Sequence, residues 1–198
     1  MPTPIAASTI MTQAFRFLEA TPPSSFDDDS EQAQAAAEQY PVALRQCLEA
    51  ADWSFASTLV FLPLAELPLT VAADPDLPYL YNLPGDLVRI HEVGDNFTRW
   101  RKDAAGLRAD ETAPLRLRYT ANITNETNLP ANFLVAVSLH LAILLASRWL
   151  PTQSKVQALE MKAQEALRLA LRQDAANASA ARYDDLDAQG DWVTEALR

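Results

Sequence analysis

The side chains that could carry out chemistry are few, and the two histidines are the first candidates. His91 lies in a stretch predicted to be a strand, and His140 lies in an apolar stretch predicted to be a helix. Neither has a Ser, Cys or Asp at a spacing typical of a catalytic triad, and Leu144 stands where a second metal ligand would follow His140. The chain also lacks GxxxxGK[ST], GxGxxG, GxSxG and HExxH motifs. We therefore expect no catalytic residue and no cofactor; a small enzyme whose site is assembled from distant residues stays the remote alternative.

A run of three aspartates, Asp27, Asp28 and Asp29, has two interpretations. As a metal site it is poorly built, because three adjacent carboxylates cannot converge on one ion without ligands from elsewhere. As the start of a helix it fits well, because Asp28 followed by Glu31 forms a capping box and acidic groups suit the first helical turn. We predict helix capping and no bound metal.

The single cysteine and the distribution of charged residues give information about possible partners and not about catalysis. The single Cys47 excludes an intrachain disulfide and a cysteine metal cage, and we predict a buried thiol. A formal net charge of −10 argues against a protein that binds nucleic acid by neutralising phosphates. Residues 19–38 hold six acidic groups and no base, whereas residues 87–120 hold seven bases and five acids. Such segregation suits subunits that meet through faces of opposite charge.

The elements that must position these groups are mainly helical. Apolar spacing predicts helices over residues 3–19, 29–52, 130–150 and 153–174, with Thr3 as the first N-cap and Pro41 kinking or splitting the second helix. The fold class is therefore mainly α: a helical bundle with an inserted small antiparallel β-meander and an extended C-terminal arm. We expect a core over residues 1–178 and an arm over residues 179–198.

The β insertion spans about residues 54–120, where short stretches with strand patterns alternate with turn residues. In the last of them, Arg116 and Arg118 alternate with apolar residues, which is the pattern of a half-buried strand. The basic face of the meander is a candidate surface for docking a partner. Its candidate residues are Arg99, Arg101, Arg116 and Arg118.

The helix over residues 130–150 is the most apolar element, and residues 133–146 carry no formal charge. A helix of ~18 residues spans about 27 Å, so a membrane-associated protein anchored by residues 131–150 is an alternative. The uncharged stretch is shorter than a usual span, Arg148 lies close to its end, and no basic flank orients it. We therefore expect a central helix of the bundle, with His140 as a core histidine and no membrane.

The C-terminal arm combines acidic groups with a short apolar patch. Residues 175–181 are small and read as a flexible linker, and residues 181–198 carry five acidic groups. The candidate docking residues of the arm are Tyr183, Trp192, Val193 and Leu197. We expect the arm to be mobile in the free subunit and ordered on a partner protein or on a neighbouring subunit, where the basic meander could receive it.

Three motifs occur in the order found in tail tubular protein A-like head–tail adaptors of tailed phages. The first is an acidic cap, Asp28-Asp29-Ser30, followed by a helix and a Trp53-Ser54-Phe55-Ala56 exit. The second is Tyr79-Leu80-Tyr81-Asn82-Leu83-Pro84-Gly85-Asp86, and the third is Leu117-Arg118-Tyr119 followed by the apolar helix. The chain resembles this family from about residue 5 to residue 178, with most of the motif aromatics expected in the core.

The resemblance implies a structural protein of the virion neck, made in the host cytoplasm. It would form a ring of about twelve copies that links the portal to the tail. Its partners would be further copies of itself, the portal protein, and a tail nozzle, stopper or tail-terminator protein. DNA would pass through the lumen without sequence-specific binding, and an acidic wall would keep a polyanion from adhering. The alternative within the same class is a neck stopper or tail-completion protein.

Overall fold

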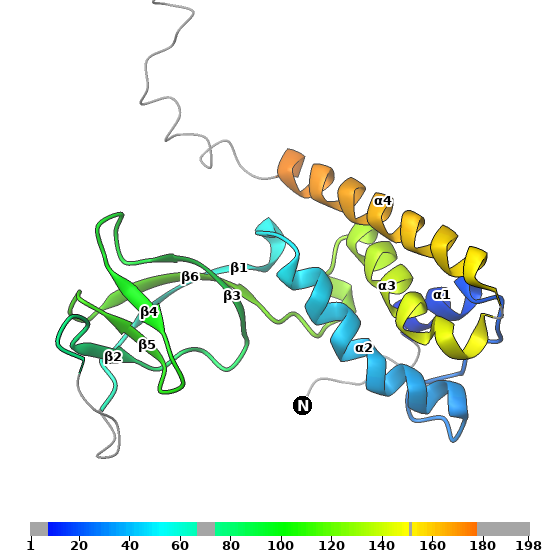
Figure 1. Cartoon of the computed structure of the whole chain (residues 1–198), viewed down its shortest axis with the longest axis horizontal. Helices are drawn as coiled ribbons and strands as arrows, with labels where there is room; N and C mark the ends of the chain where they lie inside the picture. Colours follow the sequence, from blue (N-terminus) through cyan, green and yellow to red (C-terminus); the bar gives the residue numbers. More distant parts are fainter. Residues whose placement is uncertain (1–7, 67–73, 151, 178–198) are drawn as a thin grey trace, which may run out of the picture.

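A computed structural model describes residues 8–66, 74–150 and 152–177. Within these residues, four α-helices gather at one side of the molecule and six strands at the other (Figure 1). The predicted combination of a helical bundle with a small antiparallel β insertion is thus confirmed in this coarser form. The predicted arm over residues 179–198, with Tyr183, Trp192, Val193 and Leu197, lies outside the described residues, as does the predicted N-cap Thr3.

The first helix, α1 (Thr9–Phe17), is shorter than the predicted helix over residues 3–19. Ser8 has an extended backbone, and its Oγ accepts a hydrogen bond from the Met11 N–H at 3.0 Å, so Ser8 is the N-cap. Glu126 closes the same end, because its carboxylate accepts from the Ser8 hydroxyl and, at 3.0 Å, from the Thr9 N–H. At the other end Glu19 adopts a φ of 58°, which stops the helix.

The second helix, α2 (Glu31–Glu49), begins after Ser30, whose Oγ accepts from the Ala33 N–H at 3.2 Å. The prediction that Asp28 caps this helix is wrong, because the Asp28 carboxylate instead accepts from the backbone and hydroxyl of Ser24. The helix runs through Pro41 as one element and is not split in two. It ends at Glu49 and not at residue 52 as predicted. In its last turn the Cys47 carbonyl accepts a hydrogen bond from the Trp53 indole N–H at 2.8 Å.

The apolar helix is α3 (Ala131–Trp149), and it lies among the other helices as predicted. It contacts α1, α2 and α4 (Gln153–Asn177), and its buried side chains include Phe133, Val137 and Leu141. By length and composition α3 could cross a membrane, and half of its most apolar stretch is buried inside the protein. The last turn of α4 includes residues 175–177, although their composition predicts the start of a flexible linker.

The strands form two antiparallel sheets of three, with orders β1-β6-β3 and β2-β5-β4. Their bounds are β1 (Ser57–Leu62), β2 (Tyr79–Tyr81), β3 (Leu87–Val93), β4 (Trp100–Lys102), β5 (Leu107–Ala109) and β6 (Leu115–Ala121). A simple meander would place strands in chain order, but β6 lies between β1 and β3. β6 has three buried apolar side chains, those of Leu115, Leu117 and Tyr119. Its central position between β1 and β3 is consistent with this burial, because a central strand is covered by its neighbours on both edges.

Each side of the molecule has its own apolar core. Trp53, Phe55 and Phe133 form an aromatic cluster in the helical core, with ring centroids 4.9–5.6 Å apart. The β core is built around Tyr81 and the inward residues of β6. The 3₁₀ turn η1 (Ser54–Ala56) connects α2 to β1, and η2 (Glu126–Asn128) precedes α3, so both turns join the two parts of the chain.

Candidate docking surface on the sheets

The four arginines predicted to dock a partner are divided between the two sheets. Arg99 precedes β4 and Arg101 lies on it, whereas Arg116 and Arg118 lie on β6 of the other sheet. Each of them has a partner nearby in its own chain. The structure therefore places two of the arginines at each sheet. Because three of the four lie beside an acidic side chain, the surface is less basic than the number of arginines suggests.

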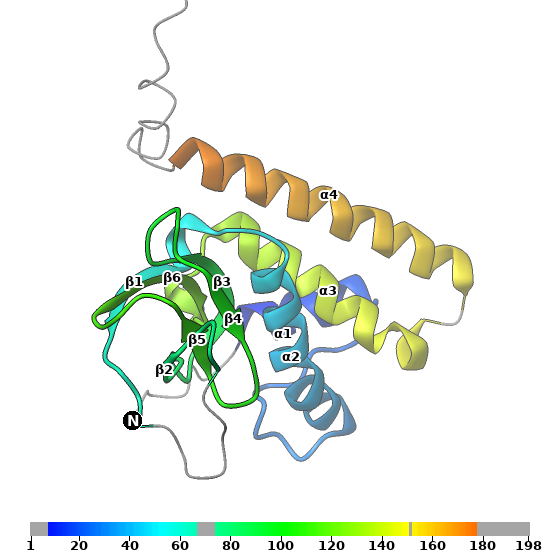
Figure 2. The ribbon, with the colours of Figure 1, turned by 60° about the vertical axis from the view of Figure 1, so that its left-hand side comes forward.

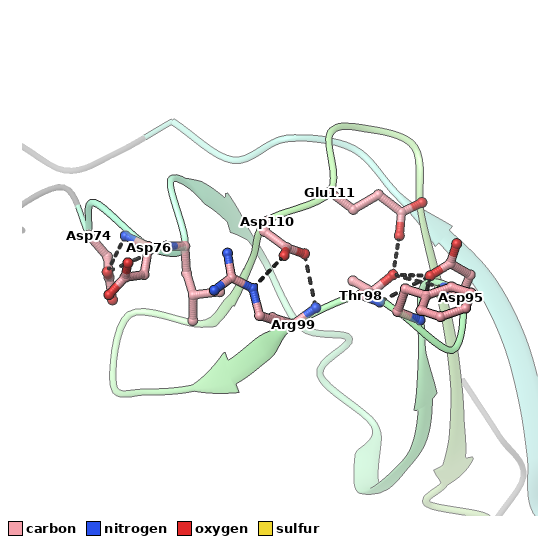
Figure 3. A network of polar contacts seen from close by, with 9 residues as sticks. Asp74, Asp76, Asp95, Thr98, Arg99, Asp110 and Glu111 are labelled. Atoms are coloured by element: carbon pink, nitrogen blue, oxygen red, sulfur yellow. Dashed lines mark hydrogen bonds and ion pairs between the residues drawn. The ribbon is translucent and has the colours of Figure 1, made fainter.

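The two arginines at β4 each form an ion pair with an aspartate, and Figure 3 shows the pair of Arg99 and Asp110. The Arg99 Nε donates to Asp110 at 2.8 Å, and this hydrogen bond lowers the pKa of Asp110 and raises that of Arg99. Arg101 forms an ion pair with Asp74, whose pKa is lowered first by the Asp76 N–H and further by Arg101. These ion pairs are exposed on the arginine side, so they orient the guanidinium groups and contribute little stability.

The second pair of arginines points outward from β6. The Arg118 Nε lies 3.3 Å from the Glu92 carboxylate of β3, and the Arg116 Nε donates to the Gly94 carbonyl at 3.0 Å. Arg116 thereby ties the sheet to the turn over residues 94–98, which we call the Phe97 turn.

The Phe97 turn is ordered by its own polar groups. Gly94 has a φ of +61°, and a side chain at this position would collide with Thr98 and Glu111. Asp95 accepts from the backbone N–H groups of Phe97 and Thr98 at 2.8 and 3.0 Å, and the first of these bonds leads the lowering of its pKa. The Thr98 hydroxyl also donates to Glu111 at 2.6 Å (Figure 3). The turn holds Phe97 with 89% of its surface exposed.

Sequence reasoning missed the apolar members of this surface. Phe97 and the partly exposed Trp100 flank Arg99, and on the other sheet Leu59 and Phe61 of β1 face outward beside Arg118 and Arg116. No periodic signal could have identified Leu59 and Phe61, since every residue from Leu59 to Leu62 is apolar and both faces of β1 look alike. Phe97 stands alone among polar neighbours, and exposed aromatic residues beside arginines are typical of interface anchors.

The two histidines differ in their surroundings. Distant residues surround His91: its Nδ1 lies 2.7 Å from Asp52 Oδ1, and its Nε2 lies 2.7 Å from the Thr120 Oγ1. This order of carboxylate, imidazole and hydroxyl resembles a triad, but Thr120 is fully buried on β6 and offers no access to a substrate. Arg89 also contacts Asp52, so the cluster fastens the end of α2 to β3. His140 faces the Ala136 carbonyl of its own helix at 3.2 Å.

The other predicted chemical groups also have structural roles. Among the described residues no group of three or more His, Cys, Asp or Glu side chains could hold a metal ion. Cys47 is buried as predicted, and burial raises the pKa of its thiol to about 12. A hollow of about 400 Å³ is lined, within the described residues, by α4 alone, so no second element faces it with polar groups.

The candidate functional site is therefore an exposed surface that combines apolar and charged side chains, and not a cavity. It consists of the Phe97 turn, Trp100 and the outward residues of β1 and β6. Comparisons of the chain with models of known protein families and with curated proteins found no match.

Proposed function

We propose that this protein is a structural head–tail adaptor of a tailed phage and not an enzyme. In this proposal the protein forms a ring that links the portal to the tail and lets DNA pass through its lumen. Two kinds of observation support the proposal: the ordered motifs that resemble the adaptor family, and an exposed surface suited to contacts between proteins.

The motif residues support the proposal as parts of the scaffold. Trp53 and Tyr81 are fully buried, and Phe55 and Tyr79 are partly buried, as expected for core aromatics. The Trp53-Ser54-Phe55-Ala56 exit forms the turn between α2 and β1, where Asp174 of α4 accepts hydrogen bonds from Ser54. Because these motifs build the fold, the function of the protein must lie on its surfaces.

The observation that carries the proposal is the exposure of Phe97 on a turn that several hydrogen bonds hold in place. An exposed Phe loses little conformational entropy on binding when the turn below it is already ordered. Phe97, Trp100 and Arg99 are residue types that dominate the energetics of protein interfaces. In a ring, such an anchor meets a different patch of the next copy, and the rotation closes the assembly. The net charge of −10 suits a lumen that DNA must slide through.

The test is assembly on a portal. The full chain is mixed with the portal protein of the same phage, and complexes are examined by negative-stain microscopy and native mass spectrometry. We expect closed rings bound to the portal, and Phe97→Ala should weaken ring closure at least tenfold while leaving the melting temperature unchanged. Met161→Ala on α4, which removes another exposed apolar side chain, is the matched control.

Two results would change the assignment. A chain that never binds a portal, alone or with other neck proteins, is not an adaptor. A chain that binds only a portal already carrying another neck protein is a stopper or tail-completion protein instead.

A further inference from the structure

Strand β1 leaves an exposed apolar edge, which we call the β1 edge and define by Leu59 and Phe61. β1 lies at the end of its sheet, and all six of its residues pair with β6. Leu59 is 47% exposed and Phe61 is 63% exposed, both on the face that carries Arg116 and Arg118. Within the described residues no other strand pairs with the outer side of β1 between residues 57 and 62.

An exposed, uncharged and apolar edge strand is unusual in a protein that does not aggregate. Natural edge strands carry charged residues, prolines or bulges that prevent pairing with other chains. The β1 sequence, Ser-Thr-Leu-Val-Phe-Leu, has none of these and combines high strand propensity with no charge. We therefore expect another extended segment to pair with the β1 edge, through backbone hydrogen bonds and apolar contacts.

The position of α4 indicates where that occupant comes from. Near its C-terminal end, Asp174 accepts hydrogen bonds from the Ser54 N–H at 2.8 Å and the Ser54 hydroxyl at 2.5 Å. Ser54 lies three residues before β1, so the chain leaves α4 beside the beginning of the β1 edge. Figures 1 and 2 both show this end of α4 on the side of the molecule that carries β1.

The sequence that follows α4 has the composition to fill the edge. Residues 191–197 read Asp-Trp-Val-Thr-Glu-Ala-Leu, with strand-forming residues at their centre. In a strand, Asp191, Val193, Glu195 and Leu197 share one face, which alternates acidic and apolar groups. In a strand added to β1, Val193 and Leu197 can lie beside Leu59 and Phe61, while Arg116 and Arg118 lie one strand further away on β6. Residues 178–190 can span up to ~45 Å when extended, and β1 is only about 20 Å long.

We propose that residues 191–197 add to the β1 edge of their own chain as a fourth strand of the β1-β6-β3 sheet. Attachment in the same chain favours this occupant, because a short linker gives it an effective concentration in the millimolar range. The added strand covers the apolar edge in the free subunit. For residues 191–197 this proposal replaces the expectation from sequence that the arm is mobile until assembly, and it does not depend on the phage function.

Photocrosslinking in the full chain tests the proposal. p-Benzoylphenylalanine replaces Phe61, which is exposed and whose replacement removes no core contact, and the protein is irradiated at low micromolar concentration. We expect a crosslink within one chain, mapped by mass spectrometry to residues 191–197. The matched control carries the same group at Phe97, which is also exposed but lies on the turn between β3 and β4, and it should not crosslink there.

A second measurement uses hydrogen exchange in the peptide that contains β1. The double variant Val193→Asp, Leu197→Asp should exchange the outward-facing β1 amides at least tenfold faster than the wild type, while exchange in α3 stays unchanged. A crosslink between two chains would assign the edge to a neighbouring copy, and no crosslink together with unchanged exchange would leave the edge uncovered. Either result overturns the proposal.

Discussion

Arg108 on β5 is only 3% exposed, and it forms an ion pair with Asp103. The Arg108 Nε donates to the Asp103 carboxylate at 2.7 Å, and this bond, followed by the Ala105 N–H, lowers the pKa of Asp103. Because the pKa of Asp103 is lower in the folded than in the unfolded protein, its ionised form stabilises the fold above the unfolded value of ~4. That contribution is lost as the pH falls through the folded pKa.

We therefore expect acid to destabilise the β-sheets through Asp103. In urea unfolding at pH 7, 4 and 3, Asp103→Asn should be less stable than the wild type at pH 7, and the difference should shrink at pH 3. The check is the pH dependence of the difference, and a difference that stays constant between pH 7 and pH 3 would argue against this role. Glu165→Gln on the exposed face of α4 is the control.

Asp174 connects the end of α4 to the turn before β1, and its two hydrogen bonds to Ser54 define a second prediction. Asp174→Ala leaves the Ser54 N–H without its acceptor and should lower the free energy of unfolding by about 1–3 kcal/mol. Asp174→Asn keeps one acceptor oxygen and should cost less. Chemical denaturation of both variants measures the difference, and equal costs would show that the charge and not the hydrogen bond matters.

At the scale of elements, the start of α2 distinguishes two possible caps. The Ser30 Oγ accepts from the Ala33 N–H, whereas Asp28 holds the preceding turn through Ser24. Ser30→Ala should cost about 1 kcal/mol, which is typical for loss of an N-cap. Asp28→Ala should cost less, because it removes only exposed hydrogen bonds. Thermal melts of the two variants rank these costs, and the reverse ranking would restore Asp28 as the cap.

The packing of α3 gives another element-scale prediction. Leu141 is fully buried against the bundle, whereas Leu144 on the same helix is only partly buried. Leu141→Ala should destabilise the protein by about 2–5 kcal/mol, and Leu144→Ala by clearly less. Both are measured by urea unfolding without detergent. If neither variant changed stability and both lost partitioning into lipid vesicles, α3 would be a membrane anchor and not a bundle helix.

At the scale of the whole molecule, each of the two apolar cores holds many large buried side chains within the described residues, which end at residue 177. Deletion of residues 182–198 should therefore leave the melting temperature within a few degrees of the wild type. The same deletion should prevent the chain from joining portal complexes, because it removes the apolar group of Trp192, Val193 and Leu197. Cosedimentation with the portal measures the second effect, and normal assembly by the truncated chain would contradict a docking role for the arm.

The pattern of apolar residues determined the helices. Each predicted helix is present, since helix formation depends on local spacing, caps and propensity. The ends shifted where two caps competed, as for Ser30 against Asp28, because both residue types accept hydrogen bonds from a helix start. The buried Cys47 and the central position of α3 also followed from sequence, because an uncharged, apolar helix is stable in water only inside a bundle.

Only the tertiary structure decided the order of the strands and the surroundings of each charge. β6 is the last of the described strands along the chain but the central strand of its sheet, and local periodicity carries no information about which strands pair. His91 meets Asp52 and Thr120 from distant parts of the chain. Arg99 and Arg118 each lie beside an acid that the fold brings to them. A charge count along the sequence cannot anticipate these pairs, because the energy of an ion pair depends on distances that the folded chain sets.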